Sequence, residues 1–333
     1  MKQNNNISIL KSNFQLLSAI EYSLVREVNL NIYYFGIPSF EIFDLIKLIN
    51  KTNNIKIGLI FFGRSYYIPI FFLLFKFLFI RLFKSQINNL LIGDERVFEF
   101  LVINKIINSK KTIILDDGIS SLYSRYLISN SEQYQFQEES FKKKISYKFK
   151  LNPHKISYFT CFESSLDESN LYDYNYHSFQ NLISSYKNKT IRTNFKAEVG
   201  NLYFIGQPLS EIKIVSEEYE LNKIVSLNFH LNEINKKITY IAHPRDSNKK
   251  IMQIKSLGIS VLQFDIMIEI MVLKGEITPD TIYGFYSSAL LTLPLLIPSI
   301  KVEILNLDKE EINLIYRDEV LQSQISIREN ILL

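Results

Sequence analysis

The chain has 333 residues, which exceeds the usual size of a single hydrophobic core and predicts about two domains. The net charge of +4 is too weak to indicate a nucleic-acid partner, and the single Cys161 excludes a disulfide within the chain and suits a reducing compartment. The N-terminal residues lack the apolar core of a signal peptide, so we expect a cytoplasmic protein.

Short apolar runs that predict strands alternate along the chain with longer segments of helical periodicity. The strand-like runs are 31–36, 56–62, 89–93, 112–117, 156–162, 202–206, 238–242, 259–264, 281–286 and 302–305. Many of them are apolar throughout rather than alternating, which is typical of parallel strands covered by helices on both faces. The pattern predicts an α/β fold with two parallel sheets.

Three segments depart from this alternation. An apolar run at 68–83 is 16 residues long, shorter than the roughly 20 residues of a spanning helix, and a buried helix, a membrane-surface helix and a span stay open for it. The basic stretch 141–155 is either a solvated face or a contact with an anionic glycan or lipid surface. Residues 163–200 are polar and poorly periodic and are interpreted as an excursion or a linker. We therefore predict domains at 1–198 and 199–333.

Polar residues end four of the predicted strands. They are Asp116, Asp117 and Gly118; Gly206, Gln207 and Pro208; His243 and Pro244; and Ser287 and Ser288. Each group has an ordinary explanation as a turn, a loop or a helix cap. Ligands of open parallel sheets bind at the carboxyl ends of the strands, and a serine pair at a helix start can hold a phosphate. Together the four groups predict a binding site.

Several familiar motifs are absent from the sequence. There is no GxxxxGK[ST] phosphate loop, no GxGxxG and no Gly-x-Ser-x-Gly elbow. The four histidines and one cysteine show no metal-ligand spacing, and Asp116 and Asp117 are adjacent rather than a spaced pair. We therefore expect no metal site.

A DDG, a downstream His-Pro and a later Ser-Ser, in this order, resemble the motif set of bacterial sialyltransferases. The chain resembles glycosyltransferase family 52, the lipooligosaccharide sialyltransferases, and the bacterial polysialyltransferases share these motifs. Residues 9–22, 204–211 and 269–290 are also similar to that family, whereas 120–200 carry no similarity. At 12–15, Ser-Asn-Phe-Gln stands where the family has Thr-Pro or Ser-Pro before Phe-Gln.

The resemblance implies a GT-B fold, with two Rossmann-like domains facing a central cleft. It also implies transfer of sialic acid with inversion from cytidine monophosphate (CMP)-sialic acid to a terminal sugar, galactose, of a surface glycan such as lipooligosaccharide or capsule. No metal and no other cofactor is implied. The first domain would supply the base and acceptor site, and the second the donor site.

The resemblance also implies roles for single residues. A sugar hydroxyl needs a positioned base at neutral pH, which would be Asp117, and His243 would donate to the leaving phosphate. Further donor-binding residues would be Gly206, Gln207, Pro244, Glu269, Ser287 and Ser288. The acceptor side or a second base would come from Asn13, Gln15, Asp116, Gly118 and Glu211.

Other functions stay open from the sequence. The donor could carry another CMP-activated nonulosonic acid, or the scaffold could serve a hexosyltransferase, because fold does not determine the donor. A chain without catalysis that binds a glycan or a membrane is a further alternative. A glycolipid acceptor leads us to expect association with the inner membrane surface, and a homodimer is a further expectation.

Overall fold

The computed structural model describes residues 6–63, 78, 87–93, 97–107, 109–129, 156–162, 173–187 and 200–332. The chain divides into unit 1, residues 1–189, and unit 2, residues 190–333. The predicted boundary at 198–199 lies near this division, outside the described residues. The apolar segment 68–83, apart from Leu78, and the basic segment 141–155 also lie outside them, so their expected roles stay predictions.

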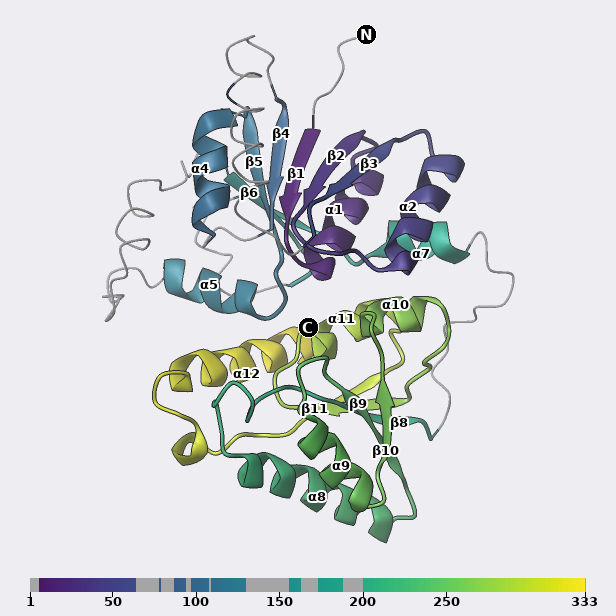
Figure 1. The fold of residues 1–333 in the computed structure, drawn as a ribbon, viewed down its shortest axis with the longest axis vertical. Helices are drawn as coiled ribbons and strands as arrows, with labels where there is room; N and C mark the ends of the chain where they lie inside the picture. The colour runs from purple at the N-terminus through teal and green to yellow at the C-terminus, as the bar shows by residue number, and fades with distance from the viewer. Residues whose placement is uncertain are drawn as a thin grey trace. The chain divides into compact units, whose positions relative to one another are not determined.

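Unit 1 contains, within the described residues, a seven-stranded parallel sheet (Figure 1). Across the sheet the strands are β3 (Ile57–Phe61), β2 (Leu30–Tyr34), β1 (Asn6–Leu10), β4 (Asn89–Ile92), β5 (Lys111–Leu115), β6 (Ile156–Thr160) and β7 (Asp173–Tyr176). Every residue of β1 and β6 is buried, as expected for central strands covered on both faces.

Helices pack on both faces of this sheet. The helices are α1 (Asn13–Val25), α2 (Phe40–Thr52), α4 (Phe98–Ile107), α5 (Ser120–Ser129) and α7 (Gln180–Lys187). One apolar cluster joins Ile9 of β1 and Ile92 of β4 to Phe100 of α4, so α4 covers one face. On the other face, α1 packs against β1, β5 and β6, and α7 packs against α1 and α2.

Unit 2 contains a five-stranded parallel sheet within residues 200–332. Its order is β10 (Ser260–Gln263), β9 (Ile238–Ala242), β8 (Leu202–Ile205), β11 (Thr281–Gly284) and β12 (Lys301–Ile304). Its helices are α8 (Glu217–Glu233), α9 (Asn248–Ser256), α10 (Ile268–Leu273), α11 (Ala289–Leu296) and α12 (Arg317–Leu332), with a 3₁₀ turn η4 (Lys309–Glu311). In Figure 1, α8 and α9 lie below this sheet and α10, α11 and α12 above it.

Both sheets have the strand order of a doubly wound fold. In unit 1 the order reverses between β1 and β4, and in unit 2 between β8 and β11. At such a reversal, neighbouring loops leave the carboxyl edge toward opposite faces, which opens a crevice where ligands bind. Each predicted strand run overlaps an observed strand, and the prediction of an α/β fold with two parallel sheets is confirmed.

Of the two interpretations of residues 163–200, an excursion or a linker, the linker is wrong for part of that segment. Residues 173–176 form β7 at the edge of the unit 1 sheet, and residues 180–187 form α7. An edge strand is covered on fewer sides, so its sequence, Asp-Tyr-Asn-Tyr, keeps polar residues and lacks the apolar run that marked the central strands. Pairing with β6 outweighs this weak local preference.

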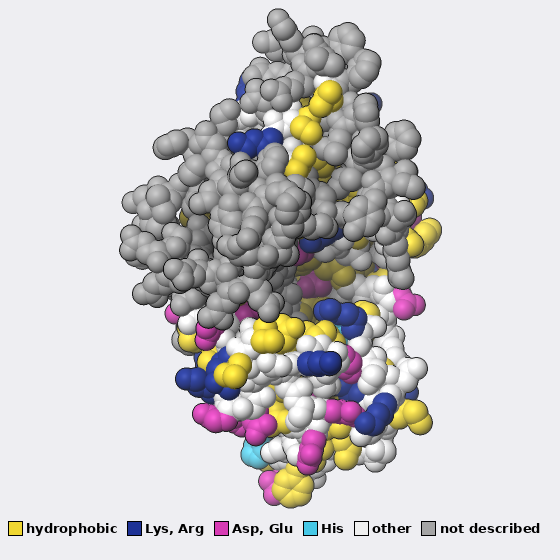
Figure 2. All heavy atoms as spheres, turned by 60° about the vertical axis from the view of Figure 1, so that its left-hand side comes forward, with side chains coloured by type: hydrophobic (Ala, Val, Ile, Leu, Met, Phe, Trp, Pro, Cys, Tyr) yellow, Lys and Arg dark blue, Asp and Glu magenta, His cyan; other side chains and the backbone are white. Residues whose placement is uncertain are grey.

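Within the described residues, no helix has the length and apolar composition that crossing a bilayer requires. On the face of unit 2 visible in Figure 2, acidic and basic side chains are interspersed rather than gathered by sign. This face therefore carries no broad basic surface of the kind that binds nucleic acid or anionic lipid.

Candidate active site

Asp117 follows β5 in unit 1 and is half-buried. The Ser12 hydroxyl donates a hydrogen bond of 2.9 Å to its Oδ1, and the Gln15 side-chain amide donates one of 2.7 Å to the same oxygen. Two donors on one carboxylate oxygen hold the group in one orientation. A carboxylate held in place in this way is suited to accept a proton as a general base.

The start of α1 explains how Ser12 and Gln15 reach Asp117. Ser12 is the N-cap of α1 and its hydroxyl accepts from the Gln15 backbone N–H, while Gln15 Oε1 accepts from the backbone N–H groups of Lys11 (2.8 Å) and Ser12 (3.3 Å). This is a capping box. Because backbone N–H groups only donate, the oxygen of Gln15 must face them and its NH₂ must face Asp117.

Gly93, at the end of β4, makes room for this arrangement. A Cβ at Gly93 would lie 2.1 Å from the carboxamide of Gln15. Both strands at the unit 1 switch point therefore contribute to the contact. Gln15, in the helix that follows β1, bonds to Asp117, and Gly93, directly after β4, leaves space for the Gln15 side chain.

The turn after Asp117 is shaped for the start of α5. Gly118 has φ of +69°, the left-handed region that favours glycine. The Asp117 backbone N–H donates to Ser121 Oγ (2.6 Å), and the Ser120 hydroxyl donates to the Asp117 carbonyl (2.7 Å). Gly118 therefore has a backbone role that does not require contact with an acceptor.

Asp116 is fully buried, unlike its neighbour. Its Oδ1 accepts from the Arg125 guanidinium (2.6 Å) and the Thr160 hydroxyl (2.8 Å), and its Oδ2 accepts from the Cys161 backbone N–H (2.8 Å). Burial raises the pKa of Asp116, and Arg125 opposes that shift only in part. The carboxylate thus ties β5, α5 and β6 together, which argues against its predicted role as a second base.

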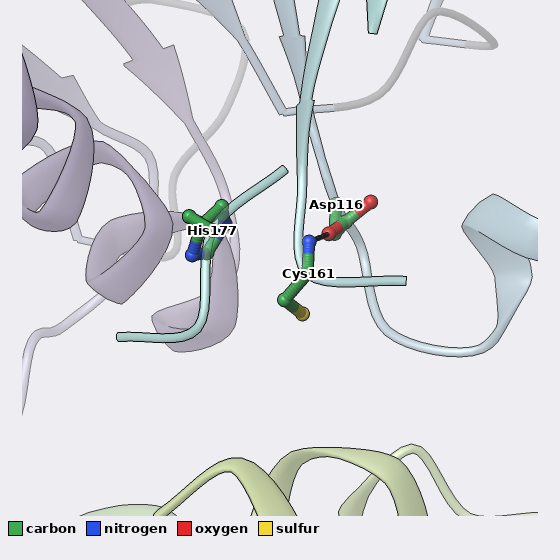
Figure 3. Close-up of side chains that lie close together, drawn as sticks. All are labelled: Asp116, Cys161 and His177. Carbon is green, nitrogen blue, oxygen red and sulfur yellow. Dashed lines mark hydrogen bonds between the residues drawn. The ribbon is translucent and has the colours of Figure 1, made fainter. Parts of the chain in front are cut away.

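One group of potential metal ligands occurs within the described ranges, although the sequence spacing gave no sign of it. Asp116, Cys161 and His177 follow β5, β6 and β7, and their ligand atoms lie within 4.8 Å of one another (Figure 3). The two ring nitrogens of His177 are buried without a hydrogen-bond partner, and burial lowers its pKa to about 3, so the ring is neutral.

The other two members fit a metal poorly. The Asp116 carboxylate already binds Arg125, whose positive charge would repel a cation. Burial raises the pKa of the Cys161 thiol well above its ordinary range, which disfavours the thiolate that binds metals. His177 stacks on Phe159 with ring centroids 4.2 Å apart, as a core aromatic residue does. The cluster is better explained as packing.

Asn13 lies at the start of α1 but contacts Tyr34 rather than Asp117. The Tyr34 hydroxyl donates 2.8 Å to Asn13 Oδ1, and burial raises the pKa of Tyr34 to about 12. Ser12 and Gln15, whose side chains donate to the Asp117 carboxylate, thus lie on either side of Asn13 in the sequence. Of these two, Ser12 was not predicted from the sequence. The Ser-x-x-Gln pattern of a capping box was the signal that could have identified it.

His243 follows β9 in unit 2 and begins a tight turn. The Asp246 backbone N–H donates to the His243 carbonyl (2.9 Å), with Pro244 at the second position, where its fixed φ suits a turn. The Arg245 backbone N–H donates to His243 Nδ1 (3.0 Å). Nδ1 must then be the acceptor, so the proton of the neutral ring sits on Nε2.

The charge state of His243 follows from its surroundings. Burial lowers the pKa of His243, the Arg245 guanidinium lowers it further, and the Asp246 carboxylate opposes both. The net shift is downward, so the neutral ring with an Nε2–H donor dominates at neutral pH. The lowered pKa therefore favours His243 as a neutral hydrogen-bond donor rather than as a charged acid.

Gly206 and Gln207 follow β8 and contact the two neighbouring chain segments, β9 and the loop after β11. A Cβ at Gly206 would lie 2.6 Å from the Ile241 carbonyl, so the close approach of β8 and β9 requires glycine. Gln207 is buried, and its Oε1 accepts from the Tyr286 backbone N–H (2.8 Å). Tyr286 immediately precedes Ser287, so Gln207 positions the loop that carries the serine pair.

Ser287 and Ser288 stand at the start of α11, and both are half-buried. The Ala289 backbone N–H donates to Ser287 Oγ (3.3 Å), whereas the Ser288 side chain makes no capping hydrogen bond. Ser287 is therefore partly used as a cap. Glu269 in α10 is buried and accepts from the Thr292 hydroxyl of α11 (2.7 Å), and burial raises its pKa.

Glu211 lies in unit 2 with both carboxylate oxygens engaged. Oε1 accepts from the Ser247 backbone N–H (2.9 Å), and Oε2 lies 3.4 Å from the Lys250 ammonium. Burial alone would raise the pKa of Glu211, but the Ser247 hydrogen bond and the Lys250 charge lower it below its ordinary value. Both oxygens of Glu211 are thus engaged by groups of unit 2, which argues against Glu211 as the alternative to Asp117.

The model of the alpha-2,8-polysialyltransferase family matches residues 45–306 of this chain, which is most of its length. The chain belongs to this family. Of the two groups that share the DDG, His-Pro and Ser-Ser motifs, the match is to the polysialyltransferases rather than the lipooligosaccharide sialyltransferases. The chain is therefore a glycosyltransferase of the sialyltransferase type. No curated protein sequence matches it significantly.

Solved structures agree on the fold at low sequence identity. A sialyltransferase, an alpha/beta-galactoside alpha-2,3-sialyltransferase from Photobacterium phosphoreum, has a TM-score of 0.56 at 13% identity, covering 98% of this chain and 97% of that one. A UDP-glucosyltransferase from Polygonum tinctorium has 0.51 at 11% identity, covering 98% and 93%. A sialyltransferase from Photobacterium damsela has 0.50 at 13% identity, covering 98% and 80%. The family member thus has the GT-B fold that the resemblance implied.

Proposed function

We propose that this chain transfers sialic acid, with inversion, from CMP-sialic acid to the 8-hydroxyl of a sialic acid that ends an acceptor glycan. The observation that carries the proposal is the Asp117 carboxylate after β5, oriented by the Ser12 hydroxyl and the Gln15 amide, which follow the switch-point strand β1. Such a carboxylate is suited to remove a proton from an acceptor hydroxyl.

The linkage in the family's description favours sialic acid over galactose as the acceptor. An alpha-2,8 linkage requires a hydroxyl at the eighth carbon of the acceptor. Galactose has six carbons and cannot offer one, whereas a nine-carbon sialic acid can. The expected galactose acceptor therefore becomes the second candidate, to be separated by experiment.

The reaction is a single displacement at the anomeric carbon of the donor. A bond forms between that carbon and the acceptor oxygen while the bond from the carbon to the phosphate oxygen breaks, and CMP leaves. Attack from the face opposite the phosphate inverts the anomeric centre. Asp117 accepts the proton of the acceptor hydroxyl as the new bond forms, an effect of about 10²–10⁴-fold in rate.

The leaving phosphate develops negative charge that unit 2 is equipped to bind. We assign His243 Nε2–H as one hydrogen-bond donor, since Nδ1 is occupied by the Arg245 N–H. The Ser288 hydroxyl and the N-terminal N–H groups of α11 would be further donors. CMP carries one phosphate, so these neutral donors are expected to suffice without a divalent cation.

A donor and acceptor panel tests the proposal. The purified protein is incubated with CMP-sialic acid, other CMP-activated nonulosonic acids and UDP-hexoses, first without acceptor and then with glycans ending in sialic acid or in galactose. We expect slow hydrolysis of CMP-sialic acid alone and transfer to the sialic acid terminus. Transfer only from a UDP-hexose, or no donor turnover at all, would refute the assignment, and transfer to galactose alone would correct the acceptor.

A further inference from the structure

Lys250 is completely buried in unit 2, in the first turn of α9. Its position contradicts the local preferences of the sequence. A cation at a helix N-terminus meets the positive end of the helix dipole, and burying an ammonium removes it from water. Its neighbour Lys249 is exposed and pairs with Glu217 on the surface, as a lysine in this position usually would. An arrangement this unfavourable locally requires compensation from the tertiary structure.

The compensation comes from four acceptors around the ammonium. Lys250 Nζ donates to the Gln207 carbonyl (2.7 Å), to Asp246 Oδ1 (3.0 Å) and to the Glu220 carboxylate, and Glu211 Oε2 lies at 3.4 Å. Burial alone would lower the pKa of Lys250, but the Glu220 and Asp246 carboxylates outweigh it and raise the pKa. The ammonium therefore stays charged.

Two of these acceptors lead directly to residues of the proposed donor site. Asp246 Oδ2 accepts from the His243 backbone N–H (2.8 Å) and from the Tyr240 hydroxyl (2.9 Å), so the carboxylate that Lys250 holds also fixes the His243 turn. On the other side, Lys250 holds the Gln207 carbonyl, and the Gln207 side chain accepts from the Tyr286 N–H.

One ammonium thus joins the loops that follow three strands of the unit 2 sheet. Gln207 follows β8, His243 and Asp246 follow β9, and Tyr286 follows β11. Each of these loops carries a residue assigned to the donor phosphate or lies next to one. A buried network whose members are all satisfied is rigid, and its members move together when one is removed.

We propose that Lys250 is a positioning residue that sets the geometry of the donor-phosphate site by holding Asp246 and the Gln207 carbonyl, and through them the His243 ring and the serine loop. The expected effect of Lys250 on donor turnover rests on the proposed function. The expected effect on the orientation of the His243 ring does not. Sequence reasoning missed Lys250 because nothing in the local pattern distinguishes it from Lys249.

The proposal also predicts how His243 titrates. The charged groups near the ring are Arg245 and Lys250, which lower the pKa of His243, and Asp246 and Glu211, which raise it, with burial the largest influence. Replacing Lys250 by methionine removes one cation from this set. The pKa of His243 should then move upward, and Asp246 should lose one of the contacts that fix the turn.

Three variants separate positioning from charge balance. Lys250→Met keeps side-chain length but leaves three carboxylates near one another, and it could fail to fold. The double variant Lys250→Met/Glu220→Gln restores the net charge of the cluster, since one positive and one negative group are lost together, yet still lacks the hold on Gln207 and Asp246. Lys249→Met is the matched control on the exposed side of the same turn.

The ring of His243 is observed directly by ¹⁵N NMR, with its signal assigned through its loss in His243→Gln. In the wild type we expect the neutral ring to be protonated on Nε2, and in both Lys250 variants a mixture of the two neutral forms. Both variants should also show the raised pKa of His243, because both lack the Lys250 cation and Glu220 is not among the charged groups near the ring. An unchanged tautomer in both Lys250 variants overturns the proposal. This readout requires no turnover, so it stands apart from failure of the proposed function.

Activity supplies the second readout. For donor turnover, kcat/KM should fall by about 10- to 100-fold in the double variant, the scale of a small misplacement of a binding group, while its thermal unfolding temperature stays near that of the wild type. Lys249→Met should match the wild type in both. If the double variant recovers full kcat/KM, Lys250 serves only to balance buried charge and the positioning role is refuted.

Discussion

Gln15 donates a hydrogen bond of 2.7 Å to Asp117 although 102 positions separate the two residues in sequence. The contact joins the end of β1 to the end of β5, across the switch point of the unit 1 sheet. It makes the first turn of α1 a support of the proposed catalytic base. The capping box that starts the helix therefore also holds the carboxylate in place.

The two adjacent aspartates should respond differently to the same substitution. Asp117→Asn should lower kcat for sialyl transfer by about 100-fold or more with little change in donor affinity, because it removes the base without changing the shape. Asp116→Asn should mainly destabilise the fold, by about 3–5 kcal/mol, because it leaves the buried Arg125 charge without its partner. Steady-state kinetics and chemical denaturation measure both, and equal kinetic losses in two stable proteins would contradict the division of roles.

The support of Asp117 by Gln15 can be tested from either side. Gln15→Leu removes a hydrogen bond to a charged group, worth about 1.5–3 kcal/mol, so kcat should fall by roughly 10- to 100-fold. Gly93→Ala should produce a similar loss, because its methyl group would displace the Gln15 carboxamide. Gly58→Ala in β3 is the control substitution in the same sheet and should leave kcat near normal. Normal kcat in the first two variants would remove Gln15 from the mechanism.

His243 should give the pH profile a limb on the acid side. Its pKa is lowered from 6.5, so the ring is neutral at pH 7, and activity should fall only as the pH drops through this lowered value. Protonation would place a second proton on Nδ1 and break its hydrogen bond with the Arg245 N–H. In His243→Gln, which retains an N–H donor but does not titrate, the limb should vanish while part of the activity remains. Activity that rises toward acid pH would instead indicate a charged histidine acting as the acid.

The serine pair should separate into a structural and a binding residue. Ser287→Ala should cost about 1 kcal/mol of stability with little change in CMP affinity, since its hydroxyl caps the Ala289 N–H. Ser288→Ala should weaken CMP binding without the loss of stability, because its side chain makes no capping bond. Titration calorimetry with CMP and thermal unfolding provide the two measurements. Unaltered CMP affinity in both variants would place the phosphate elsewhere.

Turnover should not depend on a divalent metal. We expect the rate in excess EDTA to equal the rate in magnesium or manganese, because the proposed phosphate donors are a histidine, a hydroxyl and backbone N–H groups. The Cys161→Ala/His177→Phe variant is the control for the one described group of candidate ligands, and it should keep its activity in both conditions. Loss of activity in EDTA that magnesium restores would refute the metal-free mechanism.

The sequence alone determined the architecture and the neighbourhood of the site. Apolar strands covered on both faces carry a strong local signal, so their runs identified most central strands of both sheets, although β1 was not among the runs. Parallel strands bring their carboxyl ends to one edge, which is why the positions of DDG, His-Pro and Ser-Ser directly after apolar runs were enough to assign them to strand ends. The edge strand β7 escaped because a polar strand with fewer covered sides has no such signal.

Tertiary structure alone decided which side chains at those ends are available. Successive residues of an extended chain point to opposite sides, so Asp116 is buried against Arg125 while Asp117 meets Ser12 and Gln15. Their identical chemistry did not separate them, and only the family resemblance had favoured Asp117 as the base. Lys250 was likewise indistinguishable from Lys249 until the fold brought the Glu220 and Asp246 carboxylates to its ammonium. Burial and long-range hydrogen bonding are properties of the assembled core, and no window of local sequence contains them.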